Sequence, residues 1–194
     1  MVAGCEAVQK EIGVEGSVAT KVQSIISEHD KEERDEQESM FKDAQLLMNL
    51  GREEREKRSK EILDREALAR KKRAEKTVSQ LQEALSTEQF ERVQQIAWQA
   101  GGSEALATDP RLVKSLELTD DQIKKIAAIN IEYRQKKRGQ FGLGGGFQAA
   151  LARERESNKE RDGKAAEVLT KEQQEKLAKL TGKPFDLALL MPRS

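Results

Sequence analysis

The stretch LTDDQ at residues 118–122 decides the fold, because it recurs at two other places in the chain. The other copies are LTKEQ at residues 169–173 and LSTEQ at residues 85–89, where serine replaces the threonine. In each copy the hydroxyl can accept a hydrogen bond from a free amide of the first helical turn, while the glutamine bonds back to the amide of the capping residue. The preceding leucine can pack against the next apolar residue of the helix. Each copy therefore predicts a helix start, and the capping residues are Leu85, Ser86 and Gln89, Leu118, Thr119 and Gln122, and Leu169, Thr170 and Gln173.

The positions of these copies indicate an internal duplication. Shifting residues 8–26 forward by 104 positions places Ile12 on Leu116, and shifting residues 83–96 forward by 84 positions places Gln89 on Gln173. Each half therefore opens and closes with a helix start. The opening of the first half, at residues 14–18, keeps its apolar residue but lacks the threonine and the glutamine.

Glycine and proline mark where the predicted helices end. Residues 17–50 and 52–85 contain neither residue type and surround a turn signal at residues 49–51. In the second half, helices are expected at residues 120–138 and 147–168, around a glycine-rich break at 139–146. Shorter helices are expected from Thr87 to about residue 100, ending at the glycines 101–102, from Pro110 to Leu116 with Asp109 as the cap, and after Thr170.

These signals predict an all-α fold of two tandem antiparallel helical hairpins, elongated, in which long helices are accompanied by short capping helices. The first hairpin is expected at residues 5–102 with its tip near 49–51, and the second at 103–187 with its tip at 139–146. Residues 188–194 are expected to form a C-terminal tail. Symmetry about the first tip places the polar residues 30–39 opposite Ile62, Leu63, Ala67 and Leu68, which would then need cover from elsewhere.

Composition agrees with long amphipathic helices. Charged residues and hydrophobic residues each make up 36% of the 194 residues, and aromatic residues only 4%. The 35 basic and 35 acidic residues cancel, so no net field attracts nucleic acid or an anionic membrane. No apolar run is long enough to cross a bilayer. The single cysteine, Cys5, excludes an internal disulfide.

The LTxxQ phrase bracketing helical hairpins resembles the Spy/CpxP family of bacterial envelope-stress proteins. The resemblance rests on residues 85–89, 118–122 and 169–173 and covers most of the chain loosely. It implies an ATP-independent periplasmic chaperone, or a regulator of an envelope stress sensor, that binds unfolded or partner proteins and requires no cofactor. The family usually builds its cradle from two chains, so a homodimer is possible, whereas here two hairpins occur in one polypeptide. Residues 180–187 fall outside the family pattern.

The family location would be the periplasm or cell envelope. The sequence as given shows no signal peptide, because a helix-like segment follows Met1 directly, so this location requires a trimmed precursor. Residues 2–5, VAGC, look like the end of a lipoprotein cleavage box, with Cys5 as the lipidation site, but the upstream apolar segment is missing. The alternative is an ordinary chain start followed by a small cysteine.

No catalytic, cofactor or metal site is expected. His29 is the only histidine, and its neighbourhood offers one imidazole and exposed carboxylates, which favours a histidine at the edge of an apolar stripe. The glycines at 142–146 follow a helix and lack the Lys-Ser/Thr of a nucleotide loop. Basic clusters at 71–73 and 134–138 lack interleaved aromatic residues, which argues against nucleic-acid binding. No small-molecule substrate is indicated.

Apolar residues near the two tips are the candidate binding residues. Those at the first tip are Met40, Phe41, Leu46, Leu47, Met48 and Leu50, and those at the second are Phe141, Leu143 and Phe147. They either pack against the other hairpin or a second subunit, or remain exposed and hold unfolded segments. The sequence therefore predicts a non-catalytic protein-binding module. The alternatives are a structural or oligomerising scaffold of the cell envelope and a stress-sensor regulator.

Overall fold

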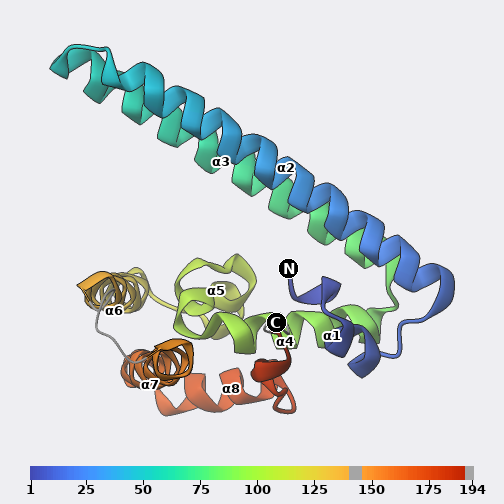
Figure 1. The fold of residues 1–194 in the computed structure, drawn as a ribbon. Coiled ribbons are helices and arrows are strands. Elements are labelled where there is room, and N and C mark those ends of the chain that lie inside the picture. Colours follow the sequence, from blue (N-terminus) through green and yellow to red (C-terminus); the bar gives the residue numbers. More distant parts are fainter. Residues whose placement is uncertain (140–145, 191–194) are drawn as a thin grey trace. The chain divides into compact units, whose positions relative to one another are not determined.

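The computed structural model describes residues 1–139 and 146–190, and these residues contain helices and no strand, which confirms the all-α prediction (Figure 1). In chain order the elements are the 3-10 turn η1 (Val2–Gly4), α1 (Glu6–Glu11), α2 (Gly16–Met48), α3 (Arg52–Ala84), α4 (Thr87–Thr108), α5 (Pro110–Leu116), α6 (Asp120–Gly139), α7 (Gly146–Ala166), α8 (Lys171–Thr181) and the 3-10 turn η2 (Leu187–Leu190).

The chain divides into two compact units, Met1–Val93 (unit 1) and the residues from Gln94 onward (unit 2). The division falls within α4, earlier than the boundary at residue 102 expected from the glycine pair. The side chains of the later turns of α4 explain the difference. Gln99 donates hydrogen bonds to the carbonyls of Thr181 and Lys183 and accepts one from the amide of Phe185, so this part of α4 belongs with the end of the chain.

Unit 1 is built on the antiparallel pair α2 and α3, which lie side by side over their length (Figure 1). The chain reverses at residues 49–51, as the sequence predicted. Arg55 stabilises this turn, because its guanidinium donates to the backbone carbonyls of Leu47, Met48 and Leu50 at 2.9–3.2 Å. These carbonyls lie at the end of α2 or just beyond it, where no further helical turn supplies amides, and within the described chain only the Leu47 carbonyl also accepts from the backbone, from the amide of Leu50.

All buried apolar residues of unit 1 lie at the base of this hairpin. They are Ala3, Val8, Ile12, Val14, Val22, Ile25, Ile26, Leu81, Leu85 and Val93. Residues 27–72, which we call the outer hairpin, contain no buried residue at all. The outer hairpin is therefore a pair of helices without a hydrophobic core of its own.

Unit 2 has a core formed by α4, α5, α6 and the segment that leads from α7 into α8. Its buried apolar residues are Leu106, Leu112, Leu116, Leu118, Ile126, Ala165 and Leu169, with Trp98, Ile123, Val168, Leu177 and Leu180 packed around them. Helices α6 and α7 contact each other side by side, and α5 contacts α8. The expected tip of this second hairpin falls largely at 140–145, outside the described residues.

The glycine pair at 101–102 separates two helical segments within the range of α4. Gly102 has φ 51° and ψ −133°, a conformation outside the helical region, and helix continues beyond it to Thr108. The Asp162 carboxylate in α7 accepts a hydrogen bond from the amide of Ser103 at 3.0 Å. The first helical segment therefore ends at the glycine pair, as the sequence predicted, and the Asp162 carboxylate caps the segment that begins after it.

The same shift of 104 positions that relates the sequences also relates the structures of the two openings. Helices α1 and α5 begin at Glu6 and Pro110 and each ends in a left-handed residue, Gly13 with φ 64° and Glu117 with φ 54°. In both, the next apolar residue donates its amide back into the helix, from Val14 to Gln9 and from Leu118 to Val113. This is the Schellman pattern of helix termination.

Candidate functional site

All three LTxxQ-type phrases form reciprocal capping boxes. The Ser86 hydroxyl accepts from the Gln89 amide at 3.2 Å, while Gln89 Oε1 accepts from the Ser86 amide at 3.1 Å. Thr119 with Gln122, and Thr170 with Gln173, make the same two bonds at 3.0–3.2 Å. The phrases therefore start α4, α6 and α8 as their chemistry predicts.

The same glutamines also tie the helix starts to distant backbone. Gln89 Nε2 donates to the carbonyl of Ile12 in unit 1, and Gln173 Nε2 donates to the carbonyl of Leu116 in unit 2, both at 3.1 Å. The shift of 84 positions carries Gln89 to Gln173, and the shift of 104 positions carries Ile12 to Leu116, so the two bonds are equivalent. They close the base of each unit, so the phrase serves both as a cap and as a tertiary contact.

Unit 2 has a second glutamine in this arrangement. Gln122 Nε2 donates to the carbonyl of Val168 at 3.0 Å and to Gln173 Oε1 at 2.7 Å, and Gln173 Nε2 donates in return to Gln122 Oε1 at 3.2 Å. The position equivalent to Gln122 in unit 1 is Val18, which has no amide to offer. We call Gln122 and Gln173 the glutamine pair, and their role is structural.

The candidate binding residues of the first tip lie on the outer hairpin. The exposed fractions are 42% for Met40, 66% for Phe41, 64% for Leu46 and 79% for Met48. Leu47 and Leu50 are half-buried. Leu46 and Leu50 also line an open depression at the tip together with Ile62 and charged residues.

Two residues of the return helix add to this surface. Leu63 and Leu68 on α3 are 64% and 53% exposed. The sequence identified them as residues in need of cover, and within the described chain they have none. We call Met40, Phe41, Leu46, Met48, Leu63 and Leu68 the exposed apolar set.

The polar part of α2 pairs further along α3 than the symmetric midpoint predicts. Lys76 Nζ donates to Glu28 at 2.8 Å and to Glu32 at 2.6 Å, and Arg73 forms an ion pair with Glu36. Residues 30–39 therefore find their cross-hairpin partners among basic residues, and not at Ile62 to Leu68 as expected. The contact of the short side chains His29 and Thr77 shows the same offset, so the register of the two helices themselves differs from the symmetric one.

The exposed ion pair between Lys76 and Glu28 stabilises the charged form of both groups. The hydrogen bond from Lys76 lowers the pKa of Glu28, and the hydrogen bond to Glu28, followed by that to Glu32, raises the pKa of Lys76. Glu28 and Lys76 therefore both stay charged near neutral pH, and the hydrogen bonds of Lys76 hold α2 and α3 together.

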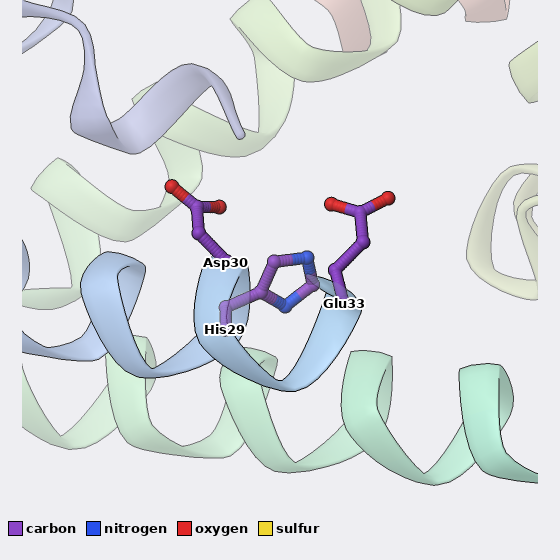
Figure 2. Close-up of side chains that lie close together, drawn as sticks. All are labelled: His29, Asp30 and Glu33. Atoms are coloured by element: carbon purple, nitrogen blue, oxygen red, sulfur yellow. The ribbon is translucent and has the colours of Figure 1, made fainter. Parts of the chain in front are cut away.

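His29 lies among carboxylates on the same helix (Figure 2). His29, Asp30 and Glu33 each offer one ligand atom, and these atoms lie within 4.8 Å of one another. On its other side, His29 Nδ1 lies 3.0 Å from the hydroxyl of Thr77 on α3. We call these three residues the His29 cluster.

The second-tip candidates cannot be placed in this way. Phe141 and Leu143 lie outside the described residues, and Phe147 lies within α7 but its side chain is not among those described. Sequence reasoning also missed Ile131 on α6, which is 51% exposed. Its position within a helix full of charged residues carries no signal that separates it from a buried isoleucine.

No helix among the described residues is both long and apolar enough to span a membrane. Comparisons with protein-family models, curated proteins and solved structures find no match to this chain.

Proposed function

We propose that the chain is a non-catalytic protein-binding module that holds unfolded or partner proteins on the exposed apolar set of its outer hairpin. The observation that carries the proposal is the absence of any buried residue in 27–72, together with six large apolar side chains exposed there. Several large apolar groups exposed on one hairpin are typical of interaction surfaces. This is the activity that the Spy/CpxP resemblance implies, and the cell envelope is the location we propose with it.

The chemistry of the surface suits weak and reversible binding. Full burial of one such side chain by a partner contributes about 1.5–3 kcal/mol, so a few of them at a time hold a partner without trapping it. Met40 and Met48 are flexible and adapt to irregular apolar segments. The acidic and basic residues that surround them attract and orient charged chains. Binding of this kind needs no nucleotide and no cofactor.

A scaffold role is the second candidate, and the same lack of a core favours it, because two outer hairpins could bury their apolar residues against each other. In that case the exposed apolar set mediates assembly of identical chains. A regulator of a stress sensor would use the same surface with one dedicated partner.

The test compares two variants in an aggregation assay with a chemically denatured client at stoichiometric protein. The triple variant Phe41→Ser, Met48→Ser and Leu63→Ser removes apolar groups that are exposed, so folding is retained. The control is Ile131→Ser, which removes an exposed apolar residue outside the outer hairpin. We expect the parent and the control to suppress aggregation and the triple variant to lose most of this effect.

Sedimentation velocity separates the two candidates. If the parent forms oligomers that the triple variant loses while suppression of aggregation is unchanged, the surface is an assembly surface. If neither the parent nor the variants bind unfolded chains, the chaperone proposal is wrong.

A further inference from the structure

We propose that the His29 cluster binds a divalent transition-metal cation through His29 Nε2 and the carboxylates of Asp30 and Glu33, with Thr77 as the positioning residue. The proposal is independent of the exposed apolar set. Its starting point is that three groups of the right chemistry converge within 4.8 Å on one turn of α2 (Figure 2). Residues four apart share a helix face, so His29 and Glu33 can reach one ion.

The hydrogen bonds of Thr77 fix the tautomer of His29. The Thr77 hydroxyl has a single proton and donates it to the backbone carbonyl of Arg73 at 2.9 Å. With this proton on the Arg73 carbonyl, the 3.0 Å contact between Thr77 Oγ1 and His29 Nδ1 has Nδ1 as its donor, and this is the tautomer that we assign. The lone pair of the ring is then on Nε2, on the side of the two carboxylates.

This arrangement matches the surroundings of metal-binding histidines in general. Such a histidine usually donates its second ring N–H to a neighbouring oxygen, which sets the ring orientation and the basicity of the ligating nitrogen. Thr77 is 2% exposed and is held by its own bond to α3, so it is a fixed acceptor. The imidazole is thus oriented before any ion arrives.

The charges around the cluster supply the second argument. Nearby acids on α2 have basic partners on α3: Glu28 and Glu32 share Lys76, and Glu36 pairs with Arg73. Within residues 1–139 and 146–190, neither Asp30 nor Glu33 makes an ion pair with a lysine or arginine. Two carboxylates without a cationic partner lie beside the open nitrogen of a histidine, and a cation would satisfy both.

The ligand types select the class of ion. One imidazole with two carboxylates suits Zn²⁺ and its first-row neighbours, whereas Mg²⁺ and Ca²⁺ prefer oxygen ligands alone. Ligand atoms around zinc lie about 3.3 Å apart at the usual bond lengths of about 2.0–2.1 Å. Rotation of the exposed Glu33 side chain closes the remaining gap. Water fills the other positions, so the ion exchanges readily.

The experiment uses the untagged full chain with Cys5→Ser as the background, because Cys5 is the only thiol and His29 the only imidazole. Zn²⁺ affinity is measured by competition with a chromogenic chelator, and long-range ¹H–¹⁵N NMR follows the two ring nitrogens. We expect one Zn²⁺ per chain, a protonated Nδ1 in the free protein, and a shift of the Nε2 signal on addition of Zn²⁺. A tenfold excess of Mg²⁺ should not displace the Zn²⁺.

Four variants assign the site. His29→Asn and Glu33→Gln should each weaken Zn²⁺ binding at least tenfold, and Thr77→Val, which keeps the shape of the buried side chain, should weaken it about 10–100-fold. Glu38→Gln, an exposed carboxylate on the same helix, is the matched control and should have no effect. Circular dichroism checks that each variant is folded. Unchanged affinity in His29→Asn, an equal loss in Glu38→Gln, or a metal bound through Nδ1 would each overturn the proposal.

Discussion

The indole Nε1 of Trp98 donates a hydrogen bond to Asp109 Oδ2 at 2.9 Å, and this links α4 to the start of α5. The other carboxylate oxygen of Asp109 accepts from the amides of Arg111 and Leu112 and so caps α5. One side chain thus satisfies a helix start and a partly buried indole at the same time.

This contact predicts an acid-dependent loss of stability. Burial alone would raise the pKa of Asp109, but the bonds from Trp98 and Arg111, the nearby Arg111 charge and the bond from Leu112 outweigh it and lower the pKa. A lowered pKa in the folded state contributes stability above the unfolded value of about 4 and loses it as the pH falls through the folded value. At pH 7, Asp109→Ala should therefore reduce the free energy of unfolding by about 1–2 kcal/mol.

The difference in the free energy of unfolding between the parent and Asp109→Ala should become smaller below about pH 4, because Asp109 of the parent then loses its charge. Fluorescence of Trp98, the only tryptophan, reports both the unfolding and the local contact. Asp121→Ala, an exposed acid in the first turn of α6, is the control. A gap between parent and Asp109→Ala that stays constant down to pH 2 would contradict this account.

The glutamine pair predicts unequal sensitivity of the two units. Gln173→Leu removes the bond from the Thr170 amide in the capping box of α8, the bond to the Leu116 carbonyl and both bonds to Gln122. Buried polar groups left without a partner cost about 1–3 kcal/mol, so unfolding by urea should show a loss in that range. Gln89→Leu in unit 1 leaves no glutamine partner behind and should cost less, and Glu175→Ala should be neutral. Equal losses at Gln89 and Gln173 would show that the pair adds nothing.

The kink in α4 predicts opposite effects of alanine at two glycines. At Gly102 a Cβ would overlap the Asp162 carboxylate, and the positive φ adds backbone strain, so Gly102→Ala should lower stability by about 1–3 kcal/mol. Gly163 lies in the last turn of α7 with open space around it, and Gly163→Ala should raise stability by up to about 0.5–1 kcal/mol. Thermal unfolding monitored at 222 nm measures both, and a stabilising alanine at 102 would refute the stated role of the glycine.

For the ion pair between Arg73 and Glu36, we expect loss of the acid and loss of the arginine to change the free energy of unfolding by different amounts. Arg73 is 7% exposed and Glu36 is its ion-pair partner, so Glu36→Gln leaves a buried charge and should cost up to about 3 kcal/mol. Arg73→Met removes the charge itself and should be close to neutral. Chemical denaturation of the two variants decides the point, and the reverse order of their stabilities would contradict it.

The sequence predicted the helix starts well, because capping is local chemistry. Gln89, Gln122 and Gln173 cap helices that begin where the three phrases occur. The turn at residues 49–51 could be predicted equally well, since a glycine separates two long stretches that contain no Gly or Pro.

Contacts between segments far apart in the chain could not be predicted from the sequence in this way. A second helical segment begins after Gly102, and Asp162, far along the chain, supplies the acceptor for its Ser103 amide. His29 was expected to be an ordinary residue at the edge of an apolar stripe, because nothing in the sequence places Thr77 beside its ring. The apolar tip residues could be named from the sequence, but their exposure depends on neighbours that only the structure supplies.

The buried residues of unit 1 lie only at its base. The length of the outer hairpin therefore does not determine the stability of this base. Paired deletion or insertion of two turns in α2 and α3 between residues 27 and 72 would change the span available to a bound segment and leave the base intact. The length of the outer hairpin can therefore change, by selection or by design, while the buried core of unit 1 stays the same.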